Sequence, residues 1–130
     1  MTPKEFIRRF KSYSQIIEDM SGIPWKVIIA QAALETGWLE DLVVDIYTGQ
    51  NSYNLFNIKG KGPAGSVKAY DIQYVKGRPR KVIAEFRAYN NYIESFEDYV
   101  QLLTKNKRYA PLMHKTDDPV EFARALQKCG

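Results

Sequence analysis

The sequence is poor in the side chains from which disulfides, zinc sites and histidine-dependent catalysts are built. Its 130 residues include one cysteine, Cys129, and one histidine, His114. A single cysteine cannot close a disulfide within the chain, and the two residues together supply too few ligands for an ordinary zinc site. A Ser-His-Asp or Cys-His catalyst would need His114 as its base, and no nucleophile turn lies near it. We therefore expect no cofactor and no metal, and we interpret His114 as a surface residue.

Long apolar runs and targeting signals are also missing. No apolar stretch approaches the roughly 18 residues of a membrane span, and the N-terminal MTPKEFIRRFK has neither the apolar stretch nor the cleavage site of a secretory signal. We therefore expect no membrane insertion, and export would need another route or a longer precursor. With 45% hydrophobic and 26% charged residues, the chain fits one globular domain over residues 1–130.

The positive charge is modest but clustered. The net charge is +4, and basic residues gather in two short segments: Lys76, Arg78, Arg80 and Lys81 in one, and Lys105, Lys107 and Arg108 in the other. Such clusters favour an anionic polymer as partner, without distinguishing nucleic acid, wall polymer and membrane surface. We expect no nucleic-acid partner, because the clusters fall in expected turns and no aromatic platform is interleaved with them.

The first third of the chain has the period of helices. Residues 2–5 read TPKE, a helix start in which threonine is the N-cap, proline takes the first helical position and glutamate closes a capping box. Apolar residues then recur at three- and four-residue steps as far as Gly22. A second helix is predicted from about Pro24 to Thr36, with Gly37 as its stop signal.

The middle of the chain changes to the period of strands. Residues 67–75 and 82–89 are rich in β-branched and aromatic residues, and 76–80 supply turn residues between them. This pattern predicts a β-hairpin, which forms a β lobe over about 66–90.

Helical signals return after the β lobe. Residues 95–98 look like a capping box, and Asp118 opens a last helix. Before the hairpin, residues 39–47 suggest one or two short helical turns and 48–65 an ordered loop. The predicted fold class is α+β, with a mainly helical body and a small β-hairpin lobe.

Residues 60–65 read GKGPAG and match the G-x-G-x-x-G pattern of phosphate-binding loops. A dinucleotide fingerprint needs a strand before it and a helix after it, whereas a hairpin strand follows here and Pro63 removes a backbone donor. We therefore reject nucleotide binding and expect a flexible hinge into the β lobe.

Glu35 is the one charged residue in the segment AQAALETGWL, residues 30–39. At helical spacing its neighbours are uncharged: Gln31, Ala32, Trp38 and Leu39. A carboxyl that is poorly solvated stays protonated near neutral pH, as a general acid must. The last turn of a helix is also an unfavourable place for an acid, because of the helix dipole. A boundary glutamate that simply reaches water is the alternative, and periodicity alone favours it.

Three sequence motifs, found in order along the chain, favour the general-acid interpretation of Glu35 over the boundary glutamate. The segments AQAALETGW, SYNLFNIKG and FRAYNNYIESFEDYVQLL, with a hairpin between the second and third, resemble the catalytic domain of family 73 of the glycoside hydrolases. That family comprises bacterial peptidoglycan N-acetylglucosaminidases, including autolysins, phage lysins and a flagellar domain. The resemblance runs from about residue 4 to 130. It implies a lysozyme-like α+β fold, with a cleft between helical body and β lobe, that hydrolyses the β-1,4 bond between N-acetylglucosamine and N-acetylmuramic acid.

The resemblance also implies catalytic residues. Glu35 falls on the family's general acid, and the family's second acid, on the first hairpin strand, aligns with Gln73, which cannot act as base or nucleophile. Asp71 points to the same face of the strand as Gln73 and could substitute for it. Otherwise Gln73 positions a water, the substrate's acetamido group assists, or the residue was altered to trap an inactive form. The family's Tyr-Ala-Thr-Asp-Pro stretch is not found before Gly130.

Six further residues are candidates for contact with glycan. Tyr53, Tyr74, Tyr89 and Tyr92 offer rings for sugar faces and hydroxyls for polar groups, although each is as readily a packing residue. Asn54 and Lys59 could hydrogen-bond glycan or fix their loop, and for Asn54 we favour the structural role.

The leading hypothesis is therefore a peptidoglycan hydrolase that acts as a monomer on glycan strands in the cell wall, in the periplasm or after secretion. A lytic transglycosylase that uses Glu35 alone is a close rival, because it needs no second carboxylate. A glycan-binding module without activity is the third reading, motivated by Gln73 and by the missing C-terminal tyrosine.

Overall fold

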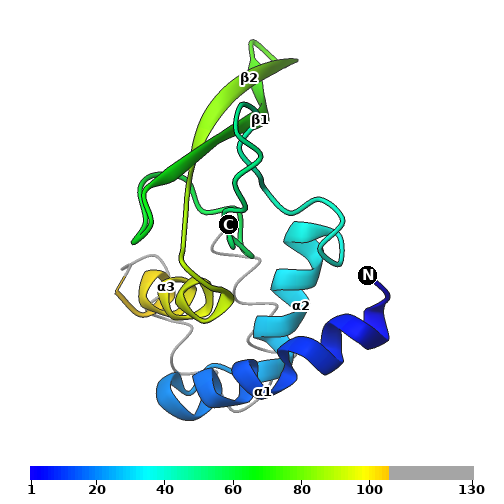
Figure 1. The fold of residues 1–130 in the computed structure, drawn as a ribbon, viewed down its shortest axis with the longest axis vertical. Helices are drawn as coiled ribbons and strands as arrows, with labels where there is room; N and C mark the ends of the chain where they lie inside the picture. Colours follow the sequence, from blue (N-terminus) through cyan, green and yellow to red (C-terminus); the bar gives the residue numbers. More distant parts are fainter. Residues whose placement is uncertain (106–130) are drawn as a thin grey trace.

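The computed structural model describes residues 1–105, which form three helices and one antiparallel hairpin (Figure 1). In chain order the elements are α1 (Pro3–Ser21), α2 (Trp25–Thr36), β1 (Ser66–Val75), β2 (Arg78–Arg87) and α3 (Tyr92–Lys105). The helices pack at one end and the hairpin projects from them at the other (Figure 1). This arrangement confirms the predicted α+β class. The helix predicted from Asp118, together with His114 and Cys129, lies outside the described residues.

Helix α1 begins as its first residues predict. The Glu5 N–H donates to Thr2 Oγ1 at 3.2 Å, and the Thr2 N–H donates to Glu5 Oε2 at 3.3 Å, which completes the capping box. The helix ends at Gly22, whose φ of 79° is the left-handed conformation that glycine adopts without steric cost. The buried face consists of Phe6, Phe10, Ser14 and Ile17.

Helix α2 packs against α1 and buries half of its residues. Its buried residues are Val27, Ile28, Ile29, Ala32, Ala33 and Thr36. Three consecutive residues after it have left-handed backbone, with φ of 53° at Gly37, 57° at Trp38 and 73° at Leu39. The Leu39 N–H donates to Thr36 Oγ1 at 3.2 Å, which stabilises this turn. The chain therefore leaves the helical path directly after Glu35.

The loop before the hairpin contributes to the helical core. Leu55 is fully buried, and the ring of Phe56 stacks on Tyr99 of α3 at 4.0 Å between centroids. The Leu55 N–H donates to the buried Ser95 Oγ at 2.9 Å. Ser95 was expected to cap α3, but the helix begins three residues earlier, and Asn91 Oδ1 accepts from the Glu94 N–H instead. Burial of Ser95 against the loop explains the difference.

The hairpin turns more tightly than the sequence suggested. Only Lys76 and Gly77 separate the strands, with φ of 53° and 78°. Two left-handed residues match the twist of the flanking strands, so the strands continue to the tip and residues 78–80 belong to β2. Near the body, Val67 and Phe86 lie opposite each other in a small buried cluster, whereas the far half of the hairpin is exposed.

Two segments before the hairpin differ from expectation. Residues 39–47 form turns and one isolated bridge rather than helical turns. The hinge expected over 60–65 is instead a hydrogen-bonded turn, because Gly62 and Gly65 exchange backbone hydrogen bonds at 2.8 and 3.0 Å and the segment also pairs with Ala88. A side chain at Gly62 would place its Cβ 2.5 Å from the Ala88 carbonyl oxygen, so close backbone approach requires glycine there.

The carboxylate of Asp45 links the turn at residues 45–48 to strand β1 and makes the stability of the fold depend on pH. Its carboxylate accepts from the backbone N–H of Lys68 at 3.0 Å and from those of Thr48 and Tyr47 at 2.9 Å each. These hydrogen bonds lower the pKa of Asp45 to about 2, and the bond from Lys68 contributes most. A carboxyl whose pKa is depressed by folding stabilises the fold above its unfolded value of about 3.9, and that contribution disappears as the pH falls through about 2.

We therefore expect Asp45→Asn to lower the free energy of unfolding most above about pH 5, with the difference from the native chain shrinking between about pH 4 and pH 2. Chemical denaturation at a series of pH values measures it, with Asp19→Asn, an exposed change on α1, as control. A difference that stayed constant down to pH 2 would contradict the prediction.

Candidate active site

Glu35 lies in the last turn of α2, with its side chain exposed. The apolar surroundings predicted from helical spacing are not formed, because the helix ends at Thr36 and the left-handed turn carries Trp38 and Leu39 away from the positions they would occupy on a longer helix. Water therefore reaches the carboxylate in the part of the molecule that the structure describes. An exposed acid at this place is accessible to a large polymeric ligand.

The side-chain partner of Glu35 is Asn57, in the loop before the hairpin. Asn57 Nδ2 donates to the main-chain oxygen of Glu35 at 2.8 Å and to its carboxylate Oε2 at 3.1 Å. Asn57 carries no sequence signal that marks it as a site residue. Its φ of 53° explains the residue type in part, since asparagine tolerates left-handed backbone better than most residues, but nothing in the sequence pairs it with an acid 22 positions away.

Asn54 holds the turn from which Asn57 projects. Its buried side chain accepts from the N–H of Phe56 at 3.3 Å and of Ile58 at 3.1 Å, and donates to the carbonyl oxygens of Ile58 and Arg87 at 2.9 Å each. These bonds occupy the amide within the protein, as the structural role favoured for Asn54 over contact with glycan requires.

Lys59 and Asp71, both predicted site residues, form an ion pair. Lys59 Nζ donates to Asp71 Oδ2 at 2.5 Å and links the loop to β1. This hydrogen bond is the main reason why the pKa of Asp71 lies below its ordinary value. Asp71 is therefore ionised at neutral pH. A carboxylate in that state can act as a base, a nucleophile or an electrostatic stabiliser, but it cannot donate a proton.

Gln73 lies one alternation beyond Asp71 on β1, opposite Arg80 of β2. The burial of Val67 and Ala69 shows that the odd-numbered residues of β1 share one face, so Asp71 and Gln73 face the same way, as predicted. Gln73 is exposed in the outer half of the hairpin. It is not brought into contact with Glu35.

The four tyrosines separate into three environments. Tyr53 and Tyr92 come together, with ring centroids 4.9 Å apart in an edge-to-face pair, and both are half-buried. Tyr74 is 73% exposed, on the opposite face of β1 from Gln73.

Tyr89 is the exception, with 1% of its surface exposed. Its hydroxyl donates to Asp98, which also pairs with Arg87 at 2.9 Å, and burial raises the pKa of Tyr89 far above its ordinary value. β2 ends at Arg87 and the chain then enters the core, so we correct the assignment of Tyr89 from glycan contact to core packing.

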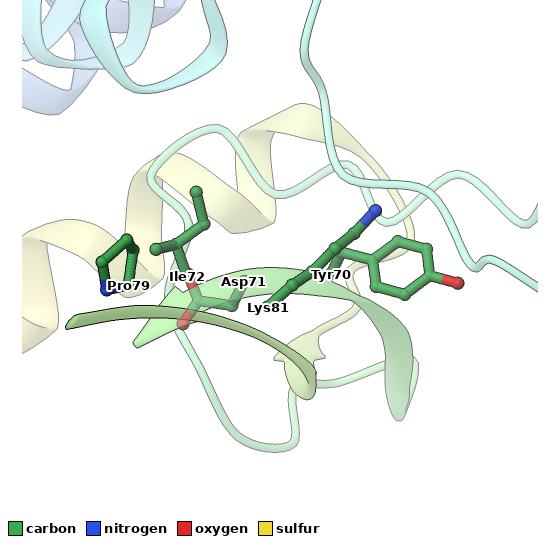
Figure 2. A pocket seen from close by; sticks show the side chains of 5 residues that line it. All are labelled: Tyr70, Asp71, Ile72, Pro79 and Lys81. Atoms are coloured by element: carbon green, nitrogen blue, oxygen red, sulfur yellow. The ribbon is translucent and has the colours of Figure 1, made fainter. Parts of the chain in front are cut away.

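A hollow of about 700 Å³ lies along the hairpin, lined by Tyr70, Asp71, Ile72, Pro79 and Lys81 (Figure 2). Lys81 Nζ lies 4.1 Å from the centroid of the Tyr70 ring. Asp71 is the one predicted site residue in this lining, and Glu35 is not part of it. The hollow is therefore a feature of the hairpin rather than of the helix that carries Glu35.

Neither a candidate metal site nor a candidate membrane-spanning helix is found among the residues that the structure describes. Within residues 1–105, no group of three or more His, Cys, Asp or Glu side chains is placed to hold a metal ion. In the same range, no helix combines the length and apolar character needed to cross a membrane. What the site does offer is two carboxylates on different elements, one paired with a neutral amide and the other with a lysine.

Comparison with known proteins gives consistent matches over almost the whole chain. The family model described as glucosaminidase, mannosyl-glycoprotein endo-beta-N-acetylglucosaminidase, matches residues 5–130. The peptidoglycan hydrolase FlgJ of Salmonella typhimurium is 40% identical in an alignment 131 residues long, which covers 98% of this chain and 40% of the relative. The chain thus spans about two fifths of the length of that curated relative.

Solved structures match the chain over almost its whole length, as the family model does. A C-terminally truncated glycoside hydrolase domain of Salmonella typhimurium FlgJ superposes with a TM-score of 0.76 at 39% identity, covering 98% of this chain and 84% of that one. A mutant peptidoglycan hydrolase from Sphingomonas sp. A1 gives a TM-score of 0.81 at 37% identity, covering 97% and 81%. The match of the family model over residues 5–130, with these relatives, shows that the chain belongs to the glucosaminidase family, family 73 of the glycoside hydrolases.

Proposed function

We propose that this chain is a peptidoglycan hydrolase that cleaves the β-1,4 bond between N-acetylglucosamine and N-acetylmuramic acid, with Glu35 as general acid. The observation that carries the proposal is the exposed carboxylate of Glu35 at the end of α2, held by an amide from a separate loop. The same fold occurs in proteins named as peptidoglycan hydrolases.

In this mechanism Glu35 protonates the glycosidic oxygen as the sugar develops oxocarbenium character. In the two-carboxylate form of this mechanism a second carboxylate acts on the other side of the bond, and Gln73 cannot do so. Asp71 is the nearest acid along the same face of β1, and its pairing with Lys59 keeps it ionised, as a base or stabiliser must be. We therefore assign the second role to Asp71.

The proposed substrate also sets the place of action and the partner. Peptidoglycan strands lie in the cell wall, so the enzyme works there, in the periplasm or after secretion, as a monomer. Tyr53, Tyr92 and Tyr74 remain the candidates for stacking on sugar rings, and Lys59 for hydrogen bonding at the rim of the site.

Glu35→Gln tests the general acid. We expect clearing of purified peptidoglycan to fall at least about 100-fold, because a general acid contributes about 10²- to 10⁴-fold. The melting temperature should stay close to that of the native chain, since the side chain is exposed. Glu97→Gln, an exposed change on α3, serves as control. Equal, background clearing by the native chain and Glu35→Gln, with retained wall binding, would instead support a non-catalytic glycan-binding module.

Asp71→Asn and Gln73→Glu test the second carboxylate. We expect Asp71→Asn to lower the rate about 10-fold or more, since the proposed base is lost. Gln73→Glu should raise it, because it returns an acid to the family's position, and Arg80 across the strands can pair with the new charge. A native rate in Asp71→Asn would remove Asp71 from the mechanism.

The products distinguish hydrolysis from lytic cleavage. Hydrolysis adds water, so mass spectrometry of digested wall should detect fragments with N-acetylglucosamine at the reducing end. Anhydromuropeptides would contradict the proposal in favour of a lytic transglycosylase that uses Glu35 alone.

A further inference from the structure

Asn57 has two features that reduce stability. Its φ of 53° lies in the left-handed region, which is unfavourable for any side chain. Its Oδ1 is buried, and no donor within residues 1–105 reaches it, so a buried acceptor lacks a hydrogen bond. Backbone outliers and unpaired buried groups concentrate at functional sites, where the surrounding structure imposes them. Asn57 combines both in a residue that contacts the candidate acid.

The same arrangement fixes the carboxyl group of Glu35. Asn57 Nδ2 bridges the main-chain oxygen and Oε2 of Glu35, at 2.8 and 3.1 Å, so the side chain is tied to its own backbone. The reversed amide would place Oδ1 against the carboxylate, with two acceptors facing each other. The observed orientation therefore satisfies Glu35 and leaves Oδ1 unpaired.

The turn that carries Asn57 is itself held from both sides. Asn54 Oδ1 accepts from the N–H of Phe56 and of Ile58, the two residues that flank Asn57. The Arg87 N–H also donates to the Ile58 carbonyl oxygen at 2.9 Å, which attaches the turn to β2. A donor on a rigid support restricts its partner more than one on a free loop does.

We propose that Asn57 is a positioning residue for Glu35: its amide holds Oε2, so that Oε1 is the oxygen that delivers the proton to the leaving glycosidic oxygen. This proposal rests on the proposed role of Glu35 as general acid. The proton passes from Oε1 to the glycosidic oxygen and leaves a carboxylate on Glu35. Asn57 stays neutral and donates to Oε2 before and after the transfer, which stabilises the charge that forms.

Asn57→Gly in the 130-residue chain is the central test. Glycine adopts the left-handed backbone at no steric cost, so this change removes the amide without adding strain. We expect an unchanged or higher melting temperature, an unchanged KM for soluble glycan fragments, and a kcat about 10- to 100-fold lower, the range found when the hydrogen-bonded partner of a metal-binding side chain is removed.

The pH dependence of kcat distinguishes a positioning role of Asn57 from a role in folding alone. A general acid must be protonated, so activity falls as the pH rises through its ionisation. In Asn57→Gly the carboxylate of Glu35 loses a hydrogen-bond donor and forms at higher pH. The fall of kcat on the basic side of the pH profile, its basic limb, should therefore shift to higher pH. Asn57→Asp places a negative charge at the same position, so it should move the limb further in the same direction.

Asn51→Gly is the matched control, because it makes the same chemical change in the same loop and Asn51 Oδ1 accepts only the Tyr53 N–H among the hydrogen bonds of residues 1–105. It should leave kcat and the basic limb unchanged. If Asn57→Gly failed to fold, the shift of the basic limb in Asn57→Asp would test the positioning role instead. Aspartate is isosteric with asparagine and also tolerates left-handed backbone.

Glu35→Gln measured alongside separates the two proposals. If Glu35→Gln lacks activity but Asn57→Gly keeps the native kcat and basic limb, the positioning role is overturned and the general acid stands. If Glu35→Gln is fully active, both are overturned. Loss of activity in Glu35→Gln, with the lowered kcat and shifted limb in Asn57→Gly, supports both.

Discussion

The buried side-chain amide of Asn54 is the interaction on which the candidate site depends. It accepts two backbone N–H groups on either side of Asn57 and donates to the carbonyl oxygens of Ile58 and Arg87. A buried polar group left without its partner costs about 1–3 kcal/mol, so these bonds strongly favour one loop conformation. That conformation aims Asn57 at α2 and, two residues later, Lys59 at β1.

One short segment, residues 57–59, therefore holds both candidate acids. Asn57 contacts Glu35 and Lys59 contacts Asp71, while Ile58 between them is bonded to β2. The buried residues of the helices and those of the hairpin form two separate clusters. Apolar packing within each cluster stabilises each part, but polar contacts of the loop set where Asp71 lies relative to α2. Substitutions of Asn57 or Lys59 should thus affect activity more than stability.

Much of the fold follows from local sequence signals. The capping box at residues 2–5, the stop at Gly37 and the alternation of Asp71 and Gln73 depend on neighbouring residues, and each was predicted correctly. Two of the errors concern contacts between distant segments. Ser95 looked like a cap because its hydroxyl favours that position, but its bond to Leu55, 40 residues away, places it inside the body.

The error in the predicted surroundings of Glu35 is instead local. Helical spacing places Trp38 and Leu39 beside it, and this inference fails because three left-handed residues end the helix at that point. Tyr89 is a candidate for glycan contact in the sequence because it falls in the predicted β lobe, but it is buried and its hydroxyl donates to Asp98 of α3. Asn57 could not be predicted from the sequence, because its role comes from a contact across 22 residues that only the turn set by Asn54 makes possible.

The two acids differ in the kind of partner that holds each, and this difference argues for their roles. A cation fixes Asp71 in its charged form, whereas Glu35 is held by a neutral amide and is open to water. In the proposed mechanism this contrast suits the two roles. Asp71, held in its charged form by Lys59, suits the base or stabiliser, and the open side of Glu35 leaves room for the glycosidic oxygen that the general acid must reach.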